Sequence, residues 1–244
     1  MMERFWSCSR CKRWRHPLLA GLLLILGGVV IGVLDLDRKV MKRCFVLGGD
    51  DVWPLGDGPP WSLFEDYGTW PANAMFLVGL LLIVAGKRDP DHSLARKGWA
   101  FSLSVALGPL LLVNAILKGL WTRPRPRHLQ GFFGTEPFRS WWLPFGGGDH
   151  ESFPSGHAAS AFVLIALALA VDGRDRPWLK AALAALVVTY GGLVSYARLL
   201  QGAHFLSDVW FGGGIGYLAA VVVDRALERT SAGSPGRGLS PLEA

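Results

Sequence analysis

Long apolar segments recur along this chain of 244 residues and constrain its fold more than any other feature. A helix needs about 20 mostly apolar residues to cross the hydrocarbon core of a bilayer. Six segments come near that requirement, at residues 17–34, 70–86, 99–117, 157–171, 178–197 and 205–223. Backbone polar groups inside a bilayer must be satisfied within the chain, so these segments are expected to be helical. The sequence therefore predicts an all-α, polytopic membrane protein with six transmembrane helices.

The composition agrees with a membrane protein and argues against two other classes. Hydrophobic residues make up 51% of the chain and charged residues only 18%, which is fewer than in most soluble domains. The net charge is +6, but Lys and Arg are dispersed among the ends of the apolar segments, which argues against nucleic-acid binding. A transporter usually places polar residues near the bilayer midplane, and the expected spans are almost free of them.

The chain divides into three parts. Residues 1–16 form a basic cytoplasmic N-terminus, residues 17–229 the six-helix membrane domain, and residues 230–244 a tail rich in Ser, Gly and Pro. Such a composition is typical of disorder. The first apolar segment could also be the core of a signal peptide. It is longer than a usual signal core and no small-residue cleavage site follows it, so we expect a retained helix.

Basic residues predict the orientation in the membrane. With the N-terminus in the cytoplasm, the inner side carries 15 Lys and Arg residues and the outer side 10. Because cytoplasmic loops are usually the richer in Lys and Arg, both termini are expected inside. Two long loops, about 35–69 and 118–156, then lie outside. Residues 35–47 are expected to form an amphipathic helix in the interface. The aromatic residues of the loop 128–150 are expected to be interface anchors, with contact to a lipid substrate as the alternative.

The cysteine and carboxylate patterns indicate neither a metal site nor a cofactor. Cys8 and Cys11 form a single C-x-x-C pair, without the second pair that a structural zinc site needs. Cys44 has no partner on its side of the membrane, so no disulfide is expected. No convergent set of carboxylates suggests magnesium. We expect no metal, no cofactor and no obligate protein partner.

Three polar segments each lie at the outer end of an expected helix, where a bilayer protein would otherwise avoid such residues. The first runs from Lys118 to residue 126 and contains two prolines, which stop the helix so that Arg125 sits on a turn just beyond it. Two fixed cations at a helix end suit a phosphate group, because a guanidinium binds two oxygens at once. Arg123 and Arg127 are expected to contact lipid headgroups or to snorkel.

The second polar segment immediately precedes the fourth expected span. Ser155 is a plausible helix N-cap. Gly156 lets the backbone approach a ligand closely. Backbone N–H groups at a helix start favour anions, and His157 stands beside them.

The third polar segment joins the last two expected spans and contains Arg198, His204 and Asp208. The histidine and the aspartate are four residues apart, so in a helix they share one face. The aspartate is then expected to accept one imidazole N–H, which fixes the tautomer and leaves the other nitrogen as a nucleophile.

Together these segments read Lys-x6-Arg-Pro, Pro-Ser-Gly-His and Arg-x5-His-x3-Asp in order, and the chain resembles the type 2 phosphatidic acid phosphatase family. The motifs span Lys118 to Asp208, and the six-helix pattern extends the resemblance over nearly the whole chain. The third motif of that family normally begins Ser-Arg, whereas here Ala197 precedes Arg198. The missing hydroxyl puts one auxiliary polar contact in doubt and none of the principal roles.

The resemblance implies a metal-independent phosphatase that works through histidine. His204 would attack phosphorus and form a phosphohistidine, while Asp208 holds its ring. His157 would protonate the leaving oxygen and then activate water. The resemblance also implies a group that binds the phosphate oxygens in the transition state: Lys118, Arg125, Ser155, the backbone at Gly156, and Arg198.

The expected substrate is a lipid phosphate that diffuses within the membrane. The site would lie at the outer interface, facing the periplasm or exterior of a bacterial inner membrane. The stretch 198–208 is more similar to the lipid A phosphatase branch of the family than to the undecaprenyl diphosphate branch. Isoprenyl diphosphates and glycerophospholipid phosphates remain alternatives. A phosphotransferase that passes the phosphate to another lipid would use the same residues.

Overall fold

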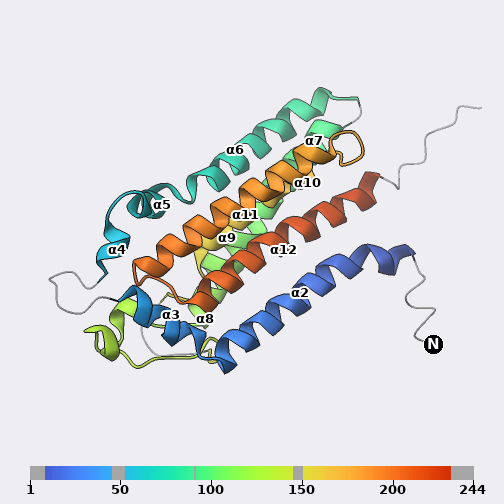
Figure 1. Cartoon of the computed structure of the whole chain (residues 1–244). Coiled ribbons are helices and arrows are strands. Elements are labelled where there is room, and N and C mark those ends of the chain that lie inside the picture. Colours follow the sequence, from blue (N-terminus) through green and yellow to red (C-terminus); the bar gives the residue numbers. More distant parts are fainter. Residues whose placement is uncertain (1–8, 46–52, 91, 145–150, 232–244) are drawn as a thin grey trace, which may run out of the picture.

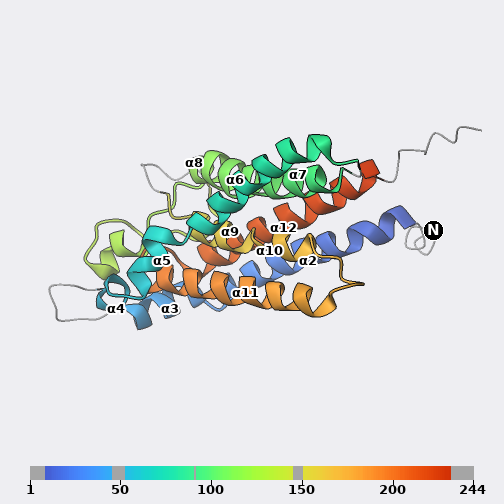
Figure 2. The same cartoon turned by 90° about the horizontal axis from the view of Figure 1, so that it is seen from above.

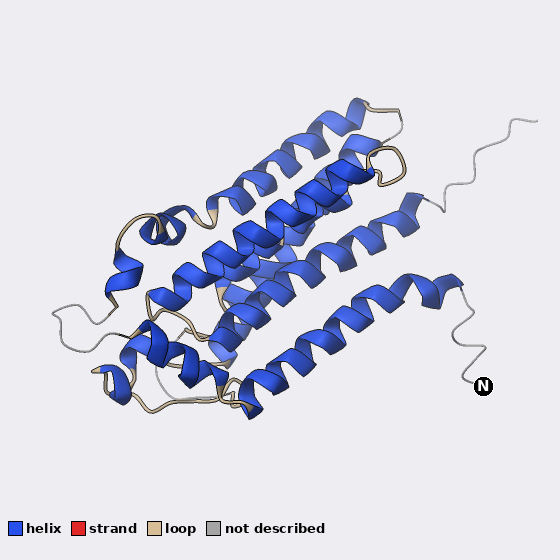
Figure 3. Ribbon diagram, in the orientation of Figure 1, coloured by secondary structure: helices blue, strands red, loops and turns tan. Residues whose placement is uncertain are grey.

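The computed structural model describes residues 9–45, 53–90, 92–144 and 151–231. Within these ranges all regular structure is helical, apart from an isolated bridge between Leu129 and Glu136 (Figure 3). The longer helices run side by side in one bundle (Figure 1). Only the first two residues of the expected tail 230–244 are described, and they form the end of the last helix.

Five stretches of helix are long and apolar enough to cross a membrane: Trp14–Val33, Trp61–Arg88, Ser93–Leu120, Pro177–Leu200 and Leu206–Glu228. The elements that form them are α2 (Ser9–Val33), α5 (Trp61–Tyr67) with α6 (Trp70–Ala85) and η1 (Gly86–Arg88), α7 (Ser93–Val105) with the π-helix η2 (Ala106–Leu117) and α8 (Lys118–Leu120), α11 (Pro177–Leu200) and α12 (Leu206–Ser231). The predicted all-α membrane architecture is confirmed for these five spans.

The sixth expected span differs from the prediction. Residues 157–171 were expected to cross the bilayer, but the structure has two short helices there, α9 (Gly156–Phe162) and α10 (Ile165–Leu169). Together they form an apolar stretch shorter than the five long spans. They pack against α11 and α12, and α9 also packs against η2. Enclosed by longer helices, this segment need not itself match the thickness of the membrane.

The remaining short elements lie at the end of the bundle where α2 ends and α12 begins (Figure 1). They are α3 (Leu36–Cys44), α4 (Pro54–Asp57), η3 (Pro126–His128) and η4 (Gln130–Phe132). The helix expected within residues 35–47 is therefore present as α3. It buries Met41 and Cys44, but it also buries a carboxylate, Asp37.

Small residues bring α9 against α12. A Cβ atom added to Gly212 would lie 2.3 Å from the Ser155 carbonyl oxygen, and one added to Gly216 would lie 2.2 Å from the Ala159 carbonyl oxygen. Both distances are too short for any side chain. Close backbone approach through glycines spaced four apart is a common way to pack membrane helices. This contact fixes the start of α9, which carries the second polar segment, against α12, which carries part of the third.

Replacing Gly212 by alanine is therefore expected to push the start of α9 away from α12. A misplacement of about 1 Å in an active site lowers activity on the order of 10²-fold. Gly192→Ala is the matched control, since a Cβ atom there meets nothing within 4 Å. Phosphate release by the two purified variants tests this, and equal activities would contradict the packing account.

The aromatic residues of the second long loop mostly pack inside the protein. Trp141 donates a hydrogen bond from Nε1 to the Gly28 carbonyl of α2 (3.0 Å). Phe138 lies edge-on to Phe205, with the ring centroids 5.5 Å apart. Among the loop aromatics that are described, Phe133 and Trp142 are exposed. The expectation of interface anchors therefore fits at most these two. Trp141 and Phe138 tie the loop to α2 and to the start of α12, and Phe132 packs against Phe45 and Trp53. Phe145 lies outside the described residues.

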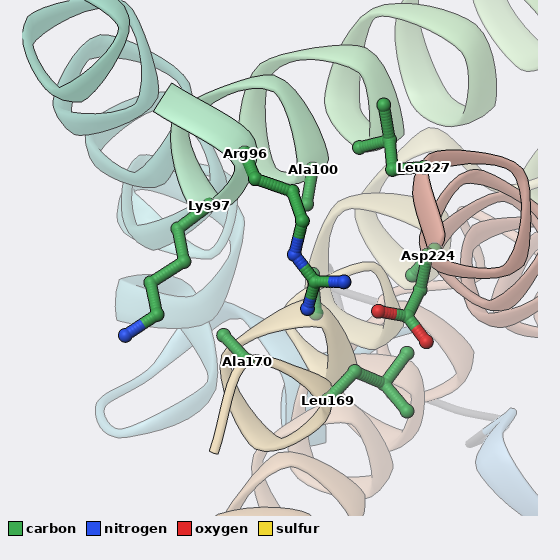
Figure 4. A pocket seen from close by; sticks show the side chains of 9 residues that line it. Arg96, Lys97, Ala100, Leu169, Ala170, Asp224 and Leu227 are labelled. Carbon is green, nitrogen blue, oxygen red and sulfur yellow. The ribbon is translucent and has the colours of Figure 1, made fainter. Parts of the chain in front are cut away.

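The opposite end of the bundle has charged residues of its own. There Arg96 of α7 and Asp224 of α12 point toward each other across a narrow pocket that Leu169 and Leu227 also line (Figure 4). The start of α2 and the end of α12 lie at this end (Figure 1). The structure thus places the helix ends nearest to both termini on one side of the bundle and the three polar segments on the other.

Candidate active site

The three polar segments meet at one end of the bundle, beside α3, α4 and α5 (Figure 2). Three hydrogen bonds between backbone groups join them: Ser152 N–H to the Arg123 carbonyl (3.0 Å), Ser155 N–H to the Asp208 carbonyl (2.9 Å), and Arg127 N–H to the Gly202 carbonyl (3.0 Å). Each segment is thus bonded to the other two. The main chain itself holds the arrangement, which leaves the side chains to serve as a site.

His204 is buried, with 3% of its surface exposed, and it lies just before α12 begins at Leu206. Its Nδ1 is 2.7 Å from the Ser152 carbonyl oxygen. A carbonyl oxygen only accepts hydrogen bonds, so Nδ1 carries the proton and donates. In the neutral ring the lone pair is then on Nε2. This is the tautomer that a nucleophile of the predicted kind needs.

The expected hydrogen bond between His204 and Asp208 is absent. The nearest carboxylate oxygen, Oδ2, is 3.7 Å from Nδ1, which is too far for a hydrogen bond. Asp208 Oδ2 instead accepts from Ser152 Oγ (2.5 Å) and from the Phe205 N–H (2.8 Å). The carboxylate turns back to cap the start of α12, so it holds His204 indirectly, by fixing Ser152.

Burial makes His204 a weak base. It lowers the pKa of this histidine to about 4; the nearby charges of Arg198 and Arg125 act in the same direction, and Asp208 opposes them. At neutral pH the ring is therefore uncharged, and its Nε2 lone pair is available.

This burial predicts an unusual pH dependence. For a histidine nucleophile with an ordinary pKa of about 6.5, the neutral, reactive fraction would fall about 25-fold between pH 7 and pH 5. Since the pKa of His204 is lowered to about 4, phosphoenzyme formation from an aryl phosphate with a good leaving group should stay level over that range. Rapid-quench rates, corrected for the ionisation of the substrate, test this. A decline centred near pH 6.5 would contradict the burial argument.

Arg198 lies at the end of α11 and is 3% exposed. Its Nη1 donates to Gln201 Oε1 (2.7 Å) and pairs with the Glu65 carboxylate of α5 (2.7 Å). Lys118 pairs more loosely with Glu151 (3.6 Å). In each pair the carboxylate is more exposed than the cation, at 43% against 3% for Glu65 and Arg198, and 63% against 17% for Glu151 and Lys118. An incoming phosphate can therefore displace either carboxylate and keep the buried cation.

Arg125 completes the group of cations. Its guanidinium is half-buried, and burial together with the charges of Arg127 and Arg198 lowers its pKa. Lys118 lies within electrostatic range of both Arg125 and Arg198. The three cations that the sequence predicted for phosphate binding are thus brought together from α8, the turn after it, and α11.

The second polar segment begins α9 as expected. Ser155 is the N-cap, and its Oγ accepts a hydrogen bond from the Ala158 N–H (3.4 Å). A Cβ atom on Gly156 would lie 2.8 Å from Asn114 Oδ1, so a larger residue there would have to displace the Asn114 amide. The next residue, His157, places its Nε2 2.9 Å from the Glu65 carbonyl oxygen. Nε2 therefore carries a proton and Nδ1 is left for proton transfer.

Arg123 differs most from its prediction. It was expected to contact lipid headgroups, but it is 1% exposed. Its guanidinium binds Asp208 of α12 and Asp37 of α3 (2.9 Å). Nothing in the local sequence distinguishes Arg123 from the neighbouring Arg127, which is exposed. Asp37 and Glu65 were also missed, because their proximity to the motifs depends on the tertiary fold. Ser152 lies three residues before Ser155 in the second polar segment, but no role was predicted for it.

Among the residues that the structure describes, no group of three or more His, Cys, Asp or Glu side chains could hold a metal ion. The expectation of metal-independent chemistry remains a prediction, and its test is given below.

A family model for the PAP2 superfamily matches residues 97–230, more than half of the chain. The chain belongs to the PAP2 superfamily. The matched region contains all of the predicted site residues, and Asp37 and Glu65 lie outside it. Other proteins to which this chain is similar include lipid A 4'-phosphatases of Rhizobium leguminosarum, 40% identical over 125 residues, and Francisella tularensis subsp. novicida, 34% identical over 151 residues.

These matches are partial. They cover 51% and 61% of this chain, and 50% and 64% of the two relatives. The chain thus spans between half and two thirds of the length of these curated PAP2 relatives. A crystal structure of a transmembrane PAP2-type phosphatidylglycerolphosphate phosphatase from Bacillus subtilis also matches, with a TM-score of 0.49 and 18% identity over 87% of this chain and 96% of that one.

Proposed function

We propose that this PAP2 protein is a membrane lipid phosphatase that works through a phosphohistidine on His204. The observation that carries the proposal is the state of that residue. His204 is buried and neutral at pH 7, its Nδ1–H is held by a backbone carbonyl, and Arg198 and Arg125 are near enough to act on its charge. A neutral imidazole beside convergent cations is suited to attack on a phosphate group.

In the first step, His204 Nε2 attacks phosphorus, and the bond between phosphorus and the lipid oxygen breaks. The leaving oxygen takes a proton from Nδ1 of the doubly protonated His157 ring. Lys118, Arg125 and Arg198 stabilise the phosphoryl oxygens, and Ser155 and the Gly156 backbone complete the group. The charge that develops on the His204 ring is offset by the Asp208 carboxylate, 3.7 Å from Nδ1.

In the second step, His157 takes a proton from a water molecule, and the resulting hydroxide attacks the phosphorus of the phosphohistidine. The bond between phosphorus and Nε2 breaks, which releases inorganic phosphate and restores the neutral His204 ring. His157 is then protonated again and ready to protonate the next leaving group.

We favour lipid A, or a similar lipid phosphate, as the substrate. Two observations support this: the relatives of this chain include lipid A 4'-phosphatases, and the site lies at the end of a bundle with five candidate membrane spans among the described residues. A lipid that stays within the membrane can bring its phosphate group to this end of the bundle.

Phosphate release from a panel of lipids by the purified protein in detergent tests this function. The panel contains lipid A, undecaprenyl diphosphate and phosphatidic acid, each with and without excess EDTA. The proposal predicts release from lipid A that EDTA leaves unchanged. Release that EDTA abolishes and magnesium restores would overturn the mechanism. Transfer of phosphate to another lipid without release would instead indicate a phosphotransferase.

The Lys and Arg distribution supports an extracytoplasmic site, with the bacterial inner membrane as its location. In a background that lacks the three native cysteines, Gly131→Cys introduces a thiol at the motif end, where a Cβ atom meets nothing within 4 Å. Asp175→Cys introduces one in the exposed turn between α10 and α11. An impermeant thiol reagent should label the first variant in intact cells and leave the second unlabelled. The reverse pattern would place the site in the cytoplasm.

A further inference from the structure

A carboxylate outside the family-matched region is buried next to the proposed site. Asp37 lies on α3 and is 4% exposed. Its Oδ1 accepts from the Ser207 N–H (2.8 Å), and its Oδ2 accepts from Ser207 Oγ (2.7 Å) and from Arg123 Nη2 (2.9 Å). Burying a charge is costly unless it is paired and hydrogen-bonded, and Asp37 has both kinds of partner.

Arg123 connects this carboxylate to Asp208. Its Nη1 donates to Asp208 Oδ1 (2.5 Å) while its Nη2 donates to Asp37, so one guanidinium bridges two carboxylates. The guanidinium plane is fixed further, because Nε donates to the Arg139 carbonyl (2.8 Å) and the ring of Phe205 lies 4.0 Å from its central carbon. A lysine has no fork that could make this bridge.

The charges of the three residues explain why a second carboxylate is useful. Asp208 and Arg123 alone form a neutral pair, and a neutral pair attracts a positive imidazole weakly. With Asp37 the group carries a net charge of −1, deep in the protein, where charges are screened least. The Asp208 carboxylate of this group lies 3.7 Å from Nδ1 of His204, the residue whose ring becomes positive when it takes up phosphate.

We propose that Asp37 is a positioning residue for the reaction: by sharing Arg123 with Asp208, it keeps a net negative charge beside His204 and holds Asp208 in place. The inference rests on the proposed function, since it assigns Asp37 to the phosphohistidine step. Arg123 is the bridge, and α3 is the element that brings Asp37 to the site.

The test compares single and double substitutions that change charge with little change in shape. Asp37→Asn leaves Arg123 and Asp208 as a neutral pair, and it should slow phosphoenzyme formation about 10- to 100-fold, as loss of an indirect support typically does. Adding Arg123→Gln to Asp37→Asn leaves Asp208 with its own charge of −1. The double variant should regain at least part of the lost rate. Asp35→Asn, at an exposed acid on the same segment that pairs with Arg38, is the control and should keep the wild-type rate.

A purely structural role of Asp37 predicts the opposite order, because each substitution removes further hydrogen bonds. A double variant slower than Asp37→Asn, or an Asp37→Asn rate equal to that of the control, would overturn the proposal. Should Asp37→Asn fail to fold, Arg123→Gln alone is compared with the double variant. The single variant keeps two carboxylates, with a charge of −2, and the double variant keeps one, so Arg123→Gln should form phosphoenzyme at least as fast as the double variant. A double variant faster than Arg123→Gln would show that the pairing of buried charges decides the rate, not their net charge, and would overturn the proposal.

A second measurement separates this inference from the proposed function. If the wild type and Asp35→Asn both form no phosphoenzyme, the proposed function fails. The link from Asp37 through Arg123 to Asp208 is then tested by measuring the pKa of His204 with NMR of protein that contains ¹⁵N-labelled histidine. Loss of the negative charge should lower this pKa in Asp37→Asn, and the double variant should restore it. An unchanged pKa in Asp37→Asn would refute the network on its own.

Discussion

Replacing His204 by alanine is expected to abolish phosphoenzyme formation and to lower lipid phosphate release on the order of 10⁴-fold or more, because the variant lacks the nucleophile. The buried ring is held by the Ser152 carbonyl. His157, the other histidine of the proposed site, has its Nε2 engaged by the Glu65 carbonyl. Rapid-quench labelling and steady-state phosphate release measure the two effects.

His16→Ala is the control for this substitution, since His16 is an exposed histidine that contacts Tyr217 at a distance from the motifs. It should behave as the wild type. If His204→Ala still traps phosphate, another residue is the nucleophile and the assignment of roles is wrong.

Replacing His157 by alanine should slow turnover of a lipid substrate at both steps, because the variant lacks the acid for the first step and the base for the second. General acid or base catalysis contributes about 10²- to 10⁴-fold. An aryl phosphate with a good leaving group needs little protonation, so phosphoenzyme formation from it should partly recover. Hydrolysis of the intermediate still needs the base. A phosphoprotein should therefore accumulate in this variant, and a time course of labelling follows it.

Two results would contradict this role of His157. One is an equal fall in the rate of phosphate release from the lipid and from the aryl phosphate in His157→Ala. A group that protonates the leaving oxygen must matter more for the poorer leaving group. The other is a phosphoenzyme that decays at the wild-type rate, because the base would then be elsewhere.

The sequence predicts the membrane architecture well wherever the length of an apolar segment decides the outcome. Within the described residues, five of the six expected spans are long and apolar enough to cross a membrane. The exception is the stretch from Gly156 to Leu169. Its apolar residues are explained by the helices around it, and hydropathy alone does not separate a short enclosed helix from a span.

The motif spacing predicts which side chains meet but not how they are bonded. His204 and Asp208 are close, as four-residue spacing suggests, yet His204 precedes α12 and Asp208 turns back to cap that helix. The partner of His204 is the backbone carbonyl of Ser152. Every residue has a backbone carbonyl, so the residue type at position 152 does not predict this contact. Spacing within one segment also carries no information on a contact between segments 52 residues apart.

Arg123 shows the same limit more strongly. Its sequence context at the end of a helix favours a headgroup contact, and the fold instead buries it between Asp208 and Asp37, 86 residues away from the latter. The position of α3 over the site decides this outcome. The sequence predicted the helix within residues 35–47 but gave no reason to place its one buried acid against the motifs.

The central claim is that phosphate passes through His204, and the most direct test is to trap and map the intermediate in the wild type. Rapid quenching of the protein with a labelled substrate, followed by proteolysis and mass spectrometry under neutral and acidic conditions, locates the phosphoryl group. The account predicts an acid-labile phosphate on His204, formed and lost at rates that support turnover. An acid-stable phosphate, such as one on Ser155, or a label on any other residue would contradict it.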